Sequence, residues 1–279
     1  MRKLIITGKK LTDCFSDFIS SQKKNLNQGL NKMRIICSLI LIFSGLLLSS
    51  CSHYYYVPGA QNVPLFREKN ELHISGSYGE GSETKGINIQ AAFSLTDKIG
   101  IMADFMSAKG GNLSDHNYGK GNYFDGAVGY FKPLDKYGVF EIYGGIGRGD
   151  QYHEYSSFYN NQSTGYADLS FFKLYLQPSF GFTSDCFDIA LSTRISRITF
   201  NILDNNISGN TDSYTNLIAL SDKSHLFLEP GITIRAGWKS VKVQVQAVYS
   251  RYLNNPRLYI GEEYHISLGL YCTLGKKPR

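Results

Sequence analysis

The side chains that could do chemistry are few and form no recognisable catalytic set. Asp115 and His116 are adjacent, and Asp150 and His153 lie close together in the sequence. A carboxylate beside a histidine makes a usable general base, but Asp and His are also ordinary loop residues. No nucleophile, carboxylate pair or metal-ligand set stands at a diagnostic spacing. We therefore expect no catalytic residue, no metal and no cofactor.

A glycine-rich run at residues 144–149 (GGIGRG) is the second chemical candidate. A phosphate-binding loop needs a strand before the glycines and a helix after them. Here the glycines lie inside an alternating apolar and polar segment, and no helical pattern follows. We interpret them as glycines that let a strand bend and twist.

The thiol of Cys51 is the strongest candidate for a modification. Residues 35–48 are apolar and uncharged, too short for a membrane-spanning helix, and follow Lys32 and Arg34. This is the pattern of a secretory signal. The residues Leu48-Ser49-Ser50-Cys51 resemble a lipobox, the processing signal of bacterial lipoproteins, and the resemblance implies cleavage before Cys51 and lipid on its sulfur. An ordinary signal with an incidental cysteine is the alternative.

These features predict the division of the chain. Met33 offers a later start, so 1–32 is expected to be a non-native upstream extension or disordered. Residues 33–50 are predicted to be the signal peptide, 51–69 a lipidated tether, 70–275 the folded domain and 276–279 a tail. Ser52 and His53, rather than an acidic cluster, follow the cysteine, which favours lipid on the periplasmic side.

The charge of the chain belongs to its leader. The whole chain has a net charge of +6, and the eight basic and two acidic residues before Cys51 account for all of it. The mature part is balanced. The basic pI is therefore no evidence for nucleic-acid binding.

From Glu71 onward, side chains alternate with the period of two that is typical of half-buried strands. Residues 87–95 and 241–247 are the clearest cases. Ten such runs are present, at about 71–79, 86–96, 99–107, 122–132, 138–149, 168–183, 187–201, 225–237, 241–251 and 263–274. No segment has a convincing helical period.

The connections between these runs alternate in length. Short turns are expected at 96–98, 133–137, 184–186 and 238–240. Longer loops are expected at 107–121, 150–167, 202–224 and 252–262, with a shorter one at 80–85. Short periplasmic turns and long extracellular loops are typical of an outer-membrane barrel. We predict an all-β fold: a single antiparallel up-and-down transmembrane β-barrel of about ten strands, with eight or twelve possible.

The opposite register of each strand places charged side chains inside this barrel. A barrel of about this size is largely filled by its own side chains, and unpaired charges in its interior would be costly. We therefore predict a network of paired charges that plugs the lumen. Its members are Asp104, Asp125, Glu141, Lys173, Arg194, Glu229, Arg235 and Lys242.

Several short sequence segments resemble those of outer-membrane β-barrel proteins of unassigned function from diderm bacteria. They are residues 94–100, 126–130, 144–149 and 177–182. The C-terminal run 264–274 resembles the signal that the barrel-assembly machinery recognises, although the usual final aromatic residue is absent. The resemblance covers most of 70–275 and implies fold and location, without an activity.

The sequence thus predicts a non-enzymatic outer-membrane β-barrel lipoprotein with a largely plugged lumen and a structural or surface-interaction role. Expected partners are outer-membrane lipid and the barrel-assembly and lipoprotein-processing machineries, with no nucleic acid; the ligand of the extracellular loops is unknown. Three competing functions remain open. They are a narrow small-solute pore, a protease or lipid hydrolase at the rim, as in one class of ten-stranded surface proteases, and a periplasmic lipid-anchored soluble β-domain.

Overall fold

A computed structural model describes residues 55–112, 117–156, 163–207, 212–221, 223–254 and 261–275. The chain divides into two units, Met1–Ser52 and His53–Arg279, and the described residues all belong to the second. The predicted signal peptide, Cys51, Asp115 and His116 lie outside the described residues.

The described chain forms a closed antiparallel barrel of ten strands, which confirms the predicted fold class. Each long strand pairs with the next, and β11 closes the barrel by pairing with both β1 and β9. The two-residue strand β10 (Arg251–Tyr252) adds to the end of β8. The ten long strands are β1 (Leu72–Glu80), β2 (Thr84–Ser94), β3 (Ile99–Asn112), β4 (Asn117–Pro133), β5 (Gly138–Ser156), β6 (Ser163–Thr183), β7 (Phe187–Asn205), β8 (Ser224–Gly237), β9 (Val241–Tyr249) and β11 (Tyr264–Leu274).

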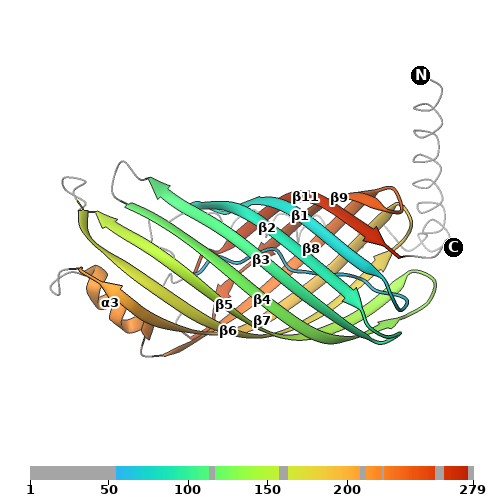
Figure 1. The fold of residues 1–279 in the computed structure, drawn as a ribbon, viewed down its shortest axis with the longest axis horizontal. Coiled ribbons are helices and arrows are strands. Elements are labelled where there is room, and N and C mark those ends of the chain that lie inside the picture. The colour runs from blue at the N-terminus through green and yellow to red at the C-terminus, as the bar shows by residue number, and fades with distance from the viewer. Residues whose placement is uncertain are drawn as a thin grey trace, which may run out of the picture. The chain divides into compact units, whose positions relative to one another are not determined.

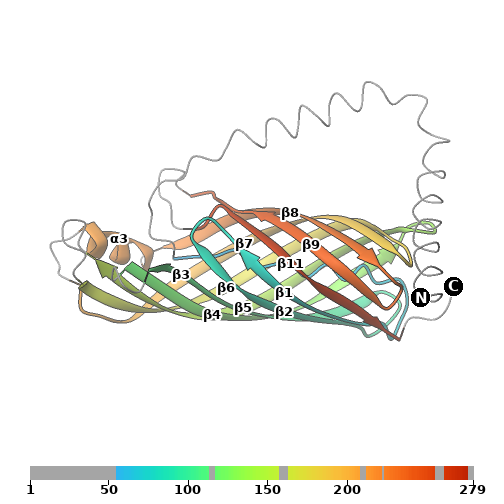
Figure 2. The ribbon, with the colours of Figure 1, turned by 90° about the horizontal axis from the view of Figure 1, so that it is seen from above.

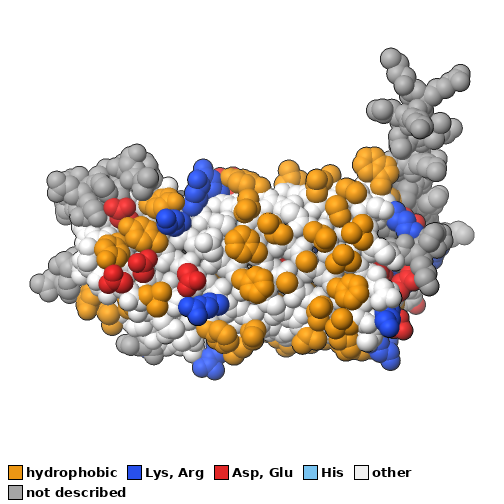
Figure 3. All heavy atoms as spheres, viewed as in Figure 1, with side chains coloured by type: hydrophobic (Ala, Val, Ile, Leu, Met, Phe, Trp, Pro, Cys, Tyr) orange, Lys and Arg blue, Asp and Glu red, His pale blue; other side chains and the backbone are white. Residues whose placement is uncertain are grey.

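Apolar side chains face outward from the barrel and polar side chains face inward. In β9, Val243 and Val245 are exposed, whereas Gln244 and Gln246 are almost fully buried. Figure 3 shows apolar side chains spread over the middle of the outer wall, with charged side chains nearer its ends. This is the reverse of a water-soluble β-protein and matches the lipid-facing band of a transmembrane barrel.

The ends of the barrel differ as the sequence predicted. Connections of three or four residues join the strands at one end, here called the turn end. At the other end, here called the loop end, the β5–β6, β7–β8 and β9–β11 connections are longer, whereas β1–β2 and β3–β4 are as short as those of the turn end (Figure 1). Strands β3 to β7 continue beyond their predicted limits at the loop end. Their extensions carry outward charges, such as Lys109, Asp150 and Asp204, instead of apolar residues. The apolar alternation therefore stops while the backbone pairing continues.

One helix lies in a connection where the sequence predicted none. Helix α3 (Asp212–Ser221) joins β7 to β8 at the loop end. Its Leu217 and Leu220 are buried in an apolar cluster with Phe200 and Phe227. The apolar residues of the helix, Leu217 to Leu220, are consecutive, so they show no helical spacing in the sequence. No helix in the described part of the chain is long and apolar enough to cross a membrane.

The segment before β1 differs most from the prediction. Residues 55–66, expected to be part of a tether outside the barrel, run through its interior, and most of their side chains are buried. Figures 1 and 2 both show this segment, at the blue end of the colour scale, inside the ring of strands. Tyr56 bridges to Gly261 at the loop end, and Phe66 packs against Phe131 near the turn end. We call residues 55–66 the lumen segment.

Candidate functional site

The eight charged residues predicted for the lumen all lie on the inner face of the barrel and are buried there. They do not form one network. The structure distributes them over several clusters, and most of these clusters also contact the lumen segment, which the sequence did not place inside the barrel.

The first cluster joins Lys173, Glu229 and Tyr56. The Tyr56 hydroxyl donates a 2.6 Å hydrogen bond to Oε1 of Glu229. The Lys173 ammonium donates a 2.5 Å hydrogen bond to the Tyr56 oxygen and lies 3.4 Å from Oε2 of Glu229. Ser196 also donates to that carboxylate, at 3.0 Å. A buried ion pair that is hydrogen-bonded in this way fixes its partners in place, so Tyr56 is bound to both β6 and β8.

The second cluster centres on Asp188, which the sequence analysis missed. Lys242 donates a 2.6 Å hydrogen bond to Oδ1 of Asp188, and Arg235 lies 3.9 Å from Oδ2. The guanidinium of Arg235 also lies 3.7 Å from the centre of the Tyr271 ring. Asp188 sits beside a short turn, where an acidic residue is typical of the surface. It lies six residues before Arg194 in the same alternating run, so the register that predicted Arg194 inside the barrel also points Asp188 inward.

Barrel side chains hydrogen-bond the backbone of the lumen segment at residues 60 and 61. At Ala60, the N–H donates to Asn88 and the carbonyl accepts from Gln90, at 3.2 and 2.9 Å. At Gln61, the N–H donates to Oε1 of Gln246 at 2.5 Å, and the carbonyl accepts from Nε2 of the same side chain at 2.8 Å. Gln246 thus makes the two bonds that a neighbouring strand would make.

The same pattern continues to the turn end. The carbonyls of Asn62, Val63 and Pro64 accept from Gln177, Arg235 and Tyr271, at 2.7, 2.7 and 2.8 Å. The Phe66 N–H donates to Glu141 at 2.9 Å. Each such bond contributes about 1 kcal/mol, more where the partner is charged. The lumen segment is therefore hydrogen-bonded to the barrel wall along most of its length.

A third cluster lies between the segment and strands β3, β4 and β7. Asp104 and Asp125 are directly opposite on adjacent strands. Asn62 donates to Asp104 at 2.7 Å, and Tyr175 donates to Asp125 at 2.6 Å. The Arg194 guanidinium lies 4.5 Å from the centre of the Tyr175 ring. A cavity of only about 10 Å³ remains here, about what one water molecule needs.

Apolar and aromatic packing closes the lumen toward each end. Phe66 lies in a buried cluster with Phe131 and Tyr143 near the turn end. Tyr55 and Tyr56 lie in a larger cluster with Phe171 and Phe227 near the loop end. The clusters around Tyr56 and Asn62 thus lie between two hydrophobic layers, whereas the Asp188 cluster lies at the turn end itself.

Glu262 ties the lumen segment to the rim at the loop end. Its backbone N–H donates a 2.8 Å hydrogen bond to the Tyr56 carbonyl. Its buried carboxylate accepts from the backbone N–H groups of Glu83 and Thr84, at 2.9 and 3.2 Å. Burial, and then the charge of Glu262, raise the pKa of Glu83. The β1–β2 turn and the chain before β11 are therefore held together over the segment.

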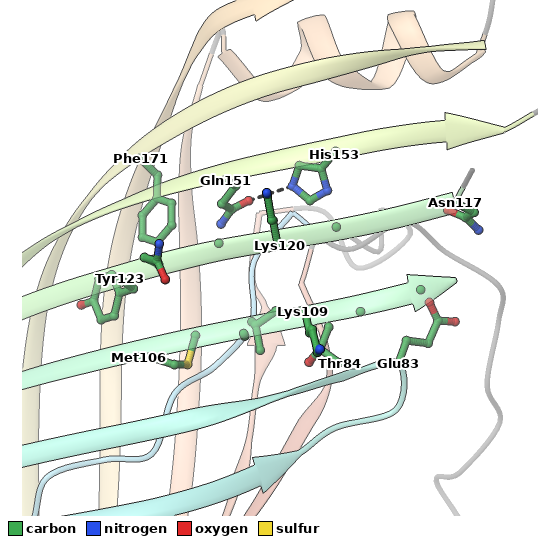
Figure 4. A pocket seen from close by; sticks show the side chains of 17 residues that line it. Glu83, Thr84, Met106, Lys109, Asn117, Lys120, Tyr123, Gln151, His153 and Phe171 are labelled. Carbon is green, nitrogen blue, oxygen red and sulfur yellow. Dashed lines mark hydrogen bonds between the residues drawn. The ribbon is translucent and has the colours of Figure 1, made fainter. Parts of the chain in front are cut away.

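A pocket opens beside the segment at the loop end (Figure 4). Its cavity volume is about 80 Å³. Its floor is formed by Val57, Met106, Tyr123 and Phe171, and His153 forms part of one side. The His153 ring lies 3.0 Å from Oε1 of Gln151 and 5.2 Å from the Tyr55 ring centre.

The candidate catalytic pairs are not brought together among the described residues. His153 is buried and lines the pocket at the loop end. Asp150 lies on the outer wall, where its carboxylate is 3.7 Å from the guanidinium of Arg148. Asp150 and His153 are therefore on opposite faces of β5. The described residues contain no group of three or more His, Cys, Asp or Glu that could hold a metal ion.

The glycine-rich run forms part of β5, with no helix after it. Gly145, Gly147 and Gly149 face inward, and a Cβ on them would lie 2.3, 2.5 and 2.3 Å from Tyr175, Tyr123 and Phe171. The absent side chains thus make room for aromatic rings. At the outward-facing Gly144, a Cβ would meet nothing within 4 Å.

No protein-family model matches the sequence, and a comparison with curated proteins found no match. Solved outer-membrane proteins do match. The N-terminal β-barrel domain of Pseudomonas aeruginosa OprF is 10% identical, covering 74% of this chain and 99% of that one, with a TM-score of 0.31. Ail of Yersinia pestis is 15% identical over 74% and 99%, with a TM-score of 0.34. The outer membrane protease OmpT of Escherichia coli is 11% identical over 74% and 94%, with a TM-score of 0.38. Similarities this low carry no information about this chain's activity.

Proposed function

We propose that this protein is a non-enzymatic β-barrel lipoprotein of the outer membrane, closed by its own N-terminal segment, with a structural or surface-interaction role. One observation carries the proposal. Side chains from the barrel wall bind the backbone of the lumen segment from Ala60 to Phe66, which leaves no open lumen for solute. The outward apolar band supports the membrane location.

Conductance in planar bilayers tests the closed lumen. Wild-type protein, shown to be folded by a band shift on boiling, should give no single-channel steps. Replacing residues 57–66 by a Gly/Ser linker of equal length should open a conducting path. Conductance by the wild type would refute the closed lumen and support the narrow pore, especially if Glu141→Gln or Arg194→Gln lowered it.

A rim enzyme and a soluble periplasmic domain receive less support. The separation of Asp150 from His153 removes one candidate pair from the rim-enzyme hypothesis. A soluble periplasmic domain would have to expose side chains such as Phe124, Ile146 and Leu268, each more than half exposed, to water. Apolar surface on this scale marks a membrane or partner contact. Solubility of a chain lacking residues 1–51, without detergent, would support the soluble domain instead.

We further propose that Cys51 is lipidated and that its lipid lies on the loop side, contrary to the periplasmic side favoured by the sequence. The lumen segment enters at the loop end, where Tyr55 accepts a 3.1 Å hydrogen bond from Tyr155. Cys51 is four residues earlier, a reach of at most about 14 Å. The apolar band of such barrels is about 25 Å tall, and the lumen is occupied. The short reach supports a lipid in the outer leaflet.

An epitope inserted between His53 and Tyr54 tests this topology on intact cells. Antibody should bind it without permeabilisation, as it should bind the same epitope in the β5–β6 loop. The epitope placed at Lys239, in a short turn, should be detected only after permeabilisation. If the epitope at residue 53 behaves like the one at Lys239, the proposed side is wrong.

A further inference from the structure

A row of three lysines crosses the outer wall of the barrel at the loop end. Lys85 of β2 is paired with Lys109 of β3, and Lys109 is paired with Lys120 of β4. All three side chains are exposed. Like charges directly opposite on neighbouring strands repel one another, so the arrangement opposes folding unless an anion lies against it.

The barrel supplies little compensation for these charges. Glu80 is opposite Lys85 on β1. No lysine of the row has a carboxylate within ion-pair distance among the described residues. Lys120 lies 5.7 Å above the ring of Tyr152, the next residue along the row. The acidic residues Asp168 and Asp204 follow Tyr152, beyond the lysines.

The wall is hollowed at this row. Lys85, Lys109, Lys120, Tyr78 and Tyr152 line a broad, shallow depression that opens outward. The tall extensions of β3 to β7 form one side of it. Asp150, Asp168 and Asp204 line the same depression on its β5–β7 side. Its cationic half therefore lies over β2 to β4, on a surface that faces away from the lumen.

The height of the row above the apolar band decides which membrane groups it can reach. On β3 and β4 the first exposed apolar residues are Phe105 and Phe124, four residues below Lys109 and Lys120. On β2 the first is Ile87, two residues below Lys85. Four residues of a tilted strand rise by about 10 Å along the barrel axis. Headgroups extend about 5–8 Å beyond the hydrocarbon, and a lysine side chain can bend back toward them. The ammonium groups thus reach the level of lipid phosphates.

We propose that Lys85, Lys109 and Lys120 form a binding site for the phosphorylated headgroup of an outer-leaflet lipid, with its acyl chains lying against the apolar wall below. The site is separate from the lumen and needs no opening of the barrel. It rests on the proposed orientation, with the loop end outward. Free anions and unphosphorylated lipids are the occupants that the test must separate from it.

The test uses purified folded protein, mixed micelles and native mass spectrometry. The probe is a glucosamine-based glycolipid carrying its phosphates, compared with the same lipid after phosphatase treatment. The variant Lys85→Gln/Lys109→Gln/Lys120→Gln should bind the phosphorylated lipid about 10- to 100-fold more weakly, from the usual contribution of a lysine near an anionic surface. A matched variant, Lys98→Gln/Lys132→Gln/Lys136→Gln, changes three exposed lysines nearer the turn end and should bind like the wild type.

Three results would overturn the proposal. The first is equal binding of the phosphorylated and the phosphatase-treated lipid. The second is unchanged binding by the Lys85/Lys109/Lys120 variant, provided that its boiling-dependent band shift shows it to be folded. The third is full displacement of the lipid by millimolar inorganic phosphate. The last would indicate a site for free anions. None of these results depends on conductance, so failure of this inference is distinguishable from failure of the closed lumen.

Discussion

Removing the charge of Glu229 should loosen the lumen segment and destabilise the whole barrel. In Glu229→Gln, the buried Lys173 loses the carboxylate that lies 3.4 Å from it. Tyr56 loses a charged acceptor at 2.6 Å. Leaving one member of a buried pair uncompensated costs about 3–5 kcal/mol. The bond to Tyr56 contributes about 1.5–3 kcal/mol, but the two losses share one carboxylate and do not simply add.

We therefore expect Glu229→Gln to lower the free energy of unfolding by about 3–5 kcal/mol. Urea unfolding in lipid vesicles measures it, followed by the fluorescence of the single tryptophan, Trp238. Lys173→Met should be destabilising for the same reason. The double variant removes both charges together and should lie closer to the wild type than the sum of the singles, by at least about 2 kcal/mol. A Glu229→Gln protein within about 1 kcal/mol of the wild type, or additive singles, would refute this reasoning.

Three further predictions concern other parts of the barrel. Asp150→Asn removes an exposed ion pair with Arg148 and should change the same unfolding free energy by less than about 1 kcal/mol; a larger effect would mean that outer-wall charges are coupled to the fold. Gly145→Ala places a Cβ against the Tyr175 ring and should cost about 1–3 kcal/mol, whereas Gly144→Ala has open space and should cost less than about 1 kcal/mol; equal urea midpoints would contradict this packing. Leu217→Ala in helix α3 removes a fully buried side chain, so limited proteolysis should cut the β7–β8 connection faster, while an altered boiling-dependent band shift would show that the helix supports the barrel itself.

The strands could be predicted because lipid and lumen impose opposite polarity on alternate residues. In β9, Val243 and Gln244 already indicate which side faces which environment. The residues at which β3 to β7 end near the loop end could not be predicted. There the outer face carries charged residues such as Lys109 and Asp204, whereas nearer the middle of the barrel the same face is apolar. Where paired strands extend beyond the membrane, both faces can be polar, so the sequence no longer alternates between apolar and polar residues.

The lumen segment was missed for a different reason. Residues 55–66 contain Pro58 and Pro64, which break the alternation, and they bond to side chains instead of to a neighbouring strand. The strands did carry a sequence signal that the lumen holds a peptide segment. Gln90, Gln177 and Gln246 all face inward, and an amide side chain can both donate to and accept from a peptide backbone. The sequence prediction considered only the charged residues of the lumen and left these amide side chains out.

Hydrogen exchange of the lumen segment tests the central claim most directly. In folded protein, the amides of Gln61 and Phe66 donate to Gln246 and Glu141 inside the barrel. Peptides covering residues 57–66 should therefore resist exchange for as long as peptides from β4 and β5, since opening of the lumen is needed to expose them. Complete exchange within seconds, with the strands still protected, would show that the segment lies outside the lumen and would contradict the account.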